Sequence, residues 1–104
     1  MITYSHYRSG KIFGMRYVFE SGNALPVHAH KPEELHNVIV LKGRCRFSSV
    51  EQSRTLEAGE VFDFDGSIEH LIVALEPCEL LSLFLNGEPE NYKSLSESDR
   101  SGVI

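Results

Sequence analysis

The sequence predicts an all-β protein, a single domain built as a barrel or sandwich of short strands. Short runs rich in Val, Ile, Phe and Tyr alternate with breaks of Gly, Pro, Asn, Asp and Ser, roughly one break every ten residues. Apolar and polar residues alternate within several runs, and no stripe with helical spacing appears between residues 10 and 87. The 104 residues, 41% of them hydrophobic, suffice for one core and leave little room for a second domain.

Each strand is expected where a run of β-forming residues is bounded by turn formers. We expect strands at Lys11–Glu20, Ala24–His30, His36–Phe47, Arg54–Glu57, Val61–Asp65, His70–Leu75 and Leu80–Leu85. The breaks that separate them in order are residues 21–23, 31–35, 48–53, 58–60, 66–69 and 76–77. Residues 1–9 then form an N-terminal edge segment, residues 10–87 the barrel, and residues 88–104, rich in Ser, Glu and Asp, a polar C-terminal tail.

Alternation with a period of two predicts which side chains face the interior, because residues two apart on a strand point the same way. Three such faces are expected, formed by Met15, Tyr17 and Phe19, by His36, Val38 and Val40, and by Phe62 and Phe64. We expect an interior pocket lined by Met15, Val38, Val40, Phe62 and Phe64, with the phenol of Tyr17 beside them.

Charge and composition exclude two classes of partner. The net charge is −5 and the basic residues are scattered, so the basic stripe that nucleic-acid binding needs is missing. No basic-then-apolar leader opens the chain, and no apolar run approaches the roughly 18 residues that span a bilayer. We therefore expect a cytoplasmic protein without nucleic-acid or membrane partners.

We expect Cys45 and Cys78 to be small core residues with free thiols, and a disulfide bridge between them is the alternative.

Four of the five histidines lie in the predicted β region. On a strand, His28 and His30 project from the same face, so both imidazoles can reach one metal ion. His36 follows a segment that can turn the chain back beside them, and His70 follows a loop of turn formers. A lone His-x-His is weak evidence for a site, and one His beside an apolar run is more often a hydrogen-bonded core residue. His6 is interpreted as an ordinary histidine.

The spacing of these residues resembles the cupins, small jelly-roll barrels whose two motifs supply metal ligands from adjoining strands. The first cupin motif runs Gly, five residues, His-x-His, three or four residues, Glu, six residues, Gly. Gly22 and His28-Ala29-His30 match its opening, and Gly43 matches its close.

The second cupin motif runs Gly, five residues, Pro-x-Gly, two residues, His, three residues, Asn. Gly59 and His70 have the required separation, whereas Asp65, Ser67 and Ala74 replace the Pro, Gly and Asn. The replaced letters are mostly turn residues, so they bear on the shape of the turn more than on the ligand. The resemblance implies a jelly-roll barrel in which the histidines of both motifs bind metal.

The third ligand, a glutamate in the family motif, falls on two different residues here. Counted forward from His30 it is Glu34, and counted back from Gly43 it is His36. We favour His36, because an insertion is tolerated better in a turn than in a paired strand, where it would shift the register. Glu34 is the alternative ligand, or else a group that supports a ligand or a solvated loop acid.

The resemblance implies one divalent transition metal, which would be Fe, Zn, Ni, Mn or Cu. It implies a dioxygenase-like non-haem metal enzyme that binds a small oxygenated organic molecule. Within the predicted pocket, Tyr17 is the candidate acid–base or substrate-orienting residue, with an ordinary core tyrosine as the alternative. The alternatives are a sugar or uronate isomerase, a non-catalytic metal-dependent small-molecule binding protein, and a barrel whose histidines no longer hold metal. A homodimer is also expected, paired through an exposed edge for which Met1–Tyr7 is the candidate.

Overall fold

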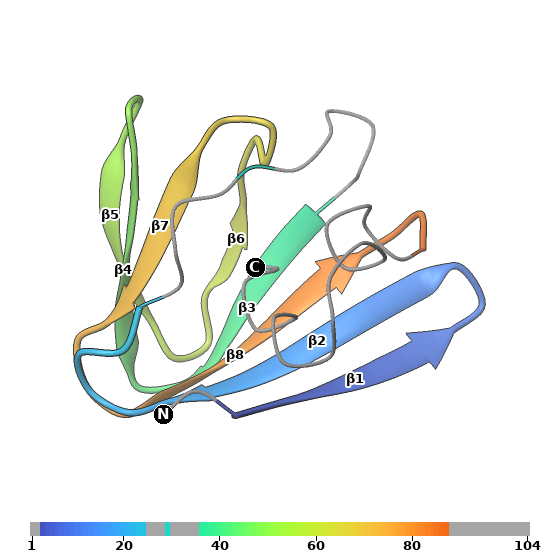
Figure 1. The fold of residues 1–104 in the computed structure, drawn as a ribbon, viewed down its shortest axis with the longest axis horizontal. Coiled ribbons are helices and arrows are strands. Elements are labelled where there is room, and N and C mark those ends of the chain that lie inside the picture. Colours follow the sequence, from blue (N-terminus) through green and yellow to red (C-terminus); the bar gives the residue numbers. More distant parts are fainter. Residues whose placement is uncertain (1–2, 25–28, 30–35, 88–104) are drawn as a thin grey trace.

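The computed structural model describes residues 3–24, 29 and 36–87, which form strands joined by turns and no helix (Figure 1). The strands are β1 (Thr3–Ser9), β2 (Ile12–Phe19), β3 (His36–Lys42), β4 (Arg44–Ser49), β5 (Ser53–Glu57), β6 (Val61–Asp63), β7 (His70–Ala74) and β8 (Cys78–Phe84). The predicted all-β class is confirmed. A search of the described residues finds no helix that could cross a membrane.

The strands form two antiparallel sheets whose inward faces share one core. The larger sheet has the order β1-β2-β8-β3-β6 and the smaller has the order β5-β4-β7. In Figure 1 the smaller sheet lies at the left, and the chain passes from one sheet to the other between β3 and β4. Phe47 and Ile72 from the smaller sheet join Met15, Val38 and Phe84 from the larger sheet in one buried cluster.

Side-chain alternation decides what this core contains, since every second side chain is buried in β7, in β8 and in β3 as far as Val40. The residues predicted to face inward are buried, with Phe64 the most exposed of them at 9%. They are Met15, Tyr17, Phe19, His36, Val38, Val40, Phe62 and Phe64. Their inward orientation is therefore confirmed, and the expectation that they line a cavity stays a prediction.

The expected strand from residue 36 to residue 47 was wrong, because two strands of different sheets occupy this range. Gly43 separates β3 from β4 and has a φ of 75°, in the left-handed region that favours glycine. A Cβ built on Gly43 would lie 2.3 Å from the carbonyl oxygen of Pro77 and 2.8 Å from the Cβ of Cys78. Only a glycine permits both this turn and this close approach, so the chain changes sheets here.

Two segments at the barrel edges complete the comparison with the expected strands. β1 is a full strand at the edge of the larger sheet, where an edge segment was expected. Of the expected strand at residues 24–30, the structure shows the antiparallel bridge between Ala24 and Val73, while residues 25–28 and 30 lie outside the described part of the chain. The predicted tail, residues 88–104, also lies outside it. Self-association through the β1 edge stays a prediction.

Candidate metal centre

His70 is the first residue of β7, and the turn before it positions its ring. The Asp65 carboxylate accepts hydrogen bonds from the hydroxyl of Ser67 at 2.6 Å and from its backbone N–H at 3.0 Å, and these bonds lower the pKa of Asp65 below its ordinary value. Nδ1 of His70 lies 2.8 Å from the carbonyl oxygen of Ile68, so Nδ1 is the donor and carries a proton. In the neutral ring the lone pair is then on Nε2.

His36 is the first residue of β3, and side chains of β8 position its ring. The ring stacks on Phe84, its cross-strand partner, with the centroids 4.3 Å apart and an interplanar angle of 3°. Nε2 of His36 is hydrogen-bonded to Oγ of Ser82, which is fully buried. One aromatic face and one hydroxyl, both from β8, therefore orient His36.

Phe64 brings the two histidines together. Its ring centroid lies 5.0 Å from that of His36 and 4.8 Å from that of His70, with both contacts edge-on. Phe47 stacks on His70 with the centroids 5.7 Å apart. Within the described part of the chain, the buried polar side chains are His36, His70 and Ser82, and the core around them is apolar. Two imidazoles from different sheets thus share one aromatic neighbour inside the barrel.

Sequence reasoning missed Ser82. The signal that could have identified it is its parity on β8, because it stands between Leu80 and Phe84 on the face that points inward. A hydroxyl at such a position needs a hydrogen-bond partner, since burying it without one is costly. The alternation pattern therefore predicts that Ser82 has a buried polar partner, although only strand pairing shows that this partner is His36.

The other predicted ligands, His28, His30 and the alternative Glu34, lie outside the described residues. In residues 3–24, 29 and 36–87, no group of three or more His, Cys, Asp or Glu side chains could hold a metal ion. The four-histidine site stays a prediction, of which the structure brings His36 and His70 to the same phenyl ring.

Tyr17, the predicted acid–base residue, lies in another part of the core. It pairs with Leu80 of β8, whereas His36 pairs with Phe84, four residues farther along that strand. The Tyr17 ring is fully buried, stacks on Phe19 at a centroid distance of 5.9 Å and lies 6.5 Å from the ring of Tyr4. Its packing is that of a core aromatic residue, and its catalytic role stays a prediction.

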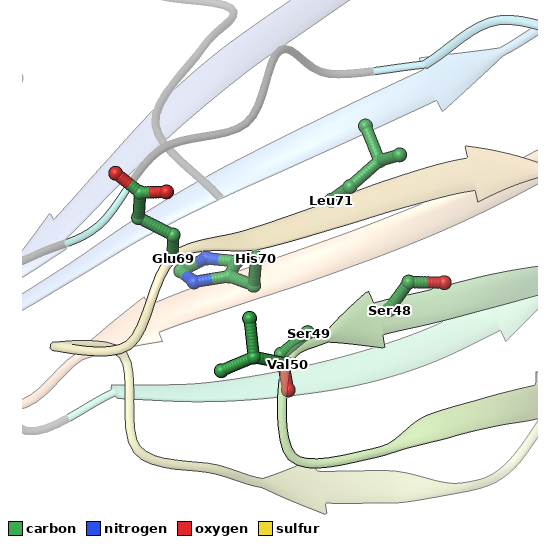
Figure 2. A pocket seen from close by; sticks show the side chains of 6 residues that line it. All are labelled: Ser48, Ser49, Val50, Glu69, His70 and Leu71. Carbon is green, nitrogen blue, oxygen red and sulfur yellow. The ribbon is translucent and has the colours of Figure 1, made fainter.

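A pocket of about 260 Å³ lies beside His70 (Figure 2). Pairing of β4 with β7 places Ser49 opposite His70 and Ser48 opposite Leu71. Figure 2 shows the His70 ring on the side of Val50, at the bend that follows β4. The described lining residues are Ser48, Ser49, Val50, Glu69, His70 and Leu71. His70 is thus buried in the barrel and also forms part of a pocket wall.

The residues present fit a divalent transition metal. Neutral imidazole is a common ligand of Zn, Cu, Fe and Ni. A histidine that binds metal usually donates its other ring N–H to a carboxylate, a backbone carbonyl or water. His70 makes such a bond to Ile68, which directs the lone pair of Nε2 away from the turn.

Comparisons with known proteins agree with the fold. The family model described as the Cupin domain (Cupin_2) matches residues 15–84, and no curated protein matches the sequence. The structure of an RmlC-like cupin from Desulfovibrio desulfuricans has a TM-score of 0.74 and 21% identity, over 84% of each chain. KdgF from Halomonas sp. has a TM-score of 0.74 and 21% identity, over 84% of this chain and 82% of that one. The Cupin_2 domain of an XRE family transcriptional regulator from Enterobacter cloacae has a TM-score of 0.70 and 16% identity, over 84% and 98%.

Proposed function

This chain belongs to the cupin domain family, and on that premise we propose that it is a metal-dependent enzyme of the dioxygenase type that acts on a small oxygenated organic molecule. The observation that carries this proposal is the pair of buried imidazoles, His36 and His70, which pack on Phe64 from two different sheets. Titratable groups gathered in a buried, apolar setting are typical of functional sites.

Four histidines would hold the metal, namely His28, His30, His36 and His70. The antiparallel bridge between Ala24 and Val73 supports this set, because it places Ala24, four residues before His28 in the sequence, beside the strand that begins at His70. A bound divalent metal supplies a Lewis acid with coordination positions left for an oxygen-bearing substrate.

Residues of this chain prepare the site in two ways. The carbonyl of Ile68 fixes the proton of His70 on Nδ1 and so presents Nε2 as the ligand atom. The rings of Phe64, Phe84 and Phe47 pack on the imidazoles and exclude water from them. Polar interactions are stronger in such a water-poor setting than at the surface.

Metal analysis of protein purified without an affinity tag tests the proposal. We expect about one transition metal ion per chain, as for other single mononuclear sites. His36→Ala and His70→Ala should each lower the metal affinity at least about tenfold. Glu34→Ala is the matched control and should leave the affinity unchanged, and circular dichroism should show that all variants are folded.

Two results would contradict the assignment. Wild-type protein that binds no metal would refute the proposed function. A larger loss of affinity for Glu34→Ala than for His36→Ala would make Glu34 the ligand.

For the reaction, we expect the Fe(II)-loaded protein to consume O₂ with a diketone, a catechol-like compound or a thiol. Turnover of uronates or keto-sugars in its place would indicate an isomerase, and full metal content without any turnover a binding protein.

A further inference from the structure

The pocket beside His70 combines apolar surface with hydroxyl groups. Val50 is apolar and yet 91% exposed, and the partly buried Leu71 lies in the same lining. Ser48 and Ser49 add two hydroxyls to this wall. The volume of about 260 Å³ is just below the roughly 300–1,000 Å³ that is typical of pockets for drug-sized ligands. A small molecule with both apolar and oxygen-bearing groups therefore suits the pocket.

Ser49 is oriented by the bend that follows β4. Its Oγ accepts hydrogen bonds from the backbone N–H of Glu51 at 3.2 Å and of Gln52 at 3.3 Å. A serine hydroxyl has two acceptor sites and one proton, so these two bonds leave the Ser49 hydroxyl acting as a donor. A neutral hydroxyl or carbonyl oxygen of a ligand can accept that proton.

Glu69 is the only charged residue among the six described residues that line the pocket. It is exposed, and Figure 2 shows its carboxylate on the side of His70 away from Val50. Of the three arginines of the smaller sheet, Arg54 is paired with Glu60 at 3.0 Å and Arg44 with Glu76 at 3.5 Å, and Arg46 is not among the described lining residues. An anionic group in the pocket would meet a like charge.

We propose that this pocket binds the uncharged, hydroxyl-bearing end of the substrate, and that Glu69 selects against a carboxylate at that end. The inference rests on the proposed function, because it takes the substrate to react beside His70. It narrows the substrate class to neutral oxygenated molecules, such as catechol-like compounds, and disfavours organic acids such as uronates.

A matched pair of probes, catechol and salicylate, tests this preference, since in salicylate a carboxylate takes the place of one of the two adjacent hydroxyls. Titrations followed by NMR use metal-free protein and protein loaded with zinc, which is redox-inactive, so binding is measured without turnover. In the metal-free protein, where no ion's charge opposes that of Glu69, we expect catechol to shift the amide signals of Ser49, Val50 and Leu71 and to bind about threefold to fivefold more tightly than the acid. Equal affinities, preference for the acid, or shifts located elsewhere would overturn the proposal.

Two substitutions separate the role of Glu69 from a general effect of charge. Glu69→Gln should remove the discrimination between the probes, and Glu69→Lys should make the acid the tighter ligand. Glu57→Lys is the matched control, because Glu57 is an exposed strand residue of the same sheet that is not among the described lining residues. If Glu57→Lys inverts the preference as strongly as Glu69→Lys, the proposal is refuted.

Metal content measured in the same samples keeps this inference distinct from the proposed function. Protein that binds no metal and still prefers catechol would refute the metal-dependent enzyme and retain the pocket preference. Protein that binds metal through the histidines and shows no preference would refute the role of Glu69 and retain the metal site.

Discussion

The two sheets hold their buried histidines in different ways. In the smaller sheet, His70 donates to the carbonyl of Ile68, two residues earlier in the chain, so its orientation comes with the turn. In the larger sheet, His36 bonds to Ser82, 46 residues away, and stacks on Phe84. A buried histidine can thus be oriented either by the turn just before it or by side chains that are distant in the sequence. The two orientations should therefore respond differently to substitution.

The junction between the sheets should give the largest effect on this arrangement. Gly43→Ala should lower the free energy of unfolding by about 3 kcal/mol or more, because it adds the cost of a left-handed backbone to a steric clash. The new Cβ would lie 2.3 Å from the oxygen of Pro77. Urea denaturation followed by circular dichroism measures the loss.

Gly10→Ala is the matched control for this substitution. Gly10 has a φ of 58° and nothing within 4 Å of an added Cβ, so the change should remove only about 1 kcal/mol. Equal losses for the two variants would contradict the steric clash predicted for a Cβ at Gly43.

The hydroxyl of Ser82 should give the next largest effect. Ser82→Ala removes the bond to buried His36 and should lower the free energy of unfolding by about 1–2 kcal/mol. It should also weaken metal binding about tenfold, because the ring loses a partner that orients it. Ser53→Ala, at an exposed site with only a 3.5 Å contact to Ser48, should change neither quantity. An unchanged metal affinity in Ser82→Ala would mean that stacking on Phe84 alone orients His36.

The two cysteines, one in each sheet, should give the smallest effect. Both are free and buried, which confirms the expectation of two core residues. Burial raises the pKa of the Cys45 thiol to about 12 and that of Cys78 to about 11. Since the thiolate is the reactive form, a disulfide reagent at pH 8 should label the native protein at least about a hundredfold more slowly than the unfolded chain. Cys45 should react more slowly than Cys78, and the reverse order would contradict the stronger burial effect at Cys45.

The same pKa shifts make the free energy of unfolding depend on pH. Below the unfolded-state thiol pKa, whose ordinary value is 9.0, both thiols are protonated in both states, so their contribution to stability is fully present. As the pH rises above that value, the unfolded thiols ionise first and unfolding becomes more favourable. A Cys45→Ala variant should therefore lose less stability between pH 9 and pH 11 than wild type, as measured by urea denaturation at each pH.

Prediction from sequence succeeded where the signal is local and failed where it depends on a distant partner. The inward faces of β2 and β3 follow from alternation. His36 is the first residue of β3, which is what the count back from Gly43 assumes. The break at Gly43 was missed because β-forming residues continue on both sides of it, although the inward-facing parity changes between Val40 and Cys45. The Phe64 contacts that join the two histidines come from one of the unspecified positions of the second cupin motif, so the motif itself does not predict them.

The sequence alone determined the all-β class, the inward-facing residues and the cupin family, because alternation and motif spacing depend on residues close together in the chain. Only the tertiary structure decided that β3 and β4 belong to different sheets and that Ser82 orients His36. It also decided that Ser49 and Glu69 share a pocket with His70. These relations depend on which strands pair, and strand pairing is set by the packing of the whole core.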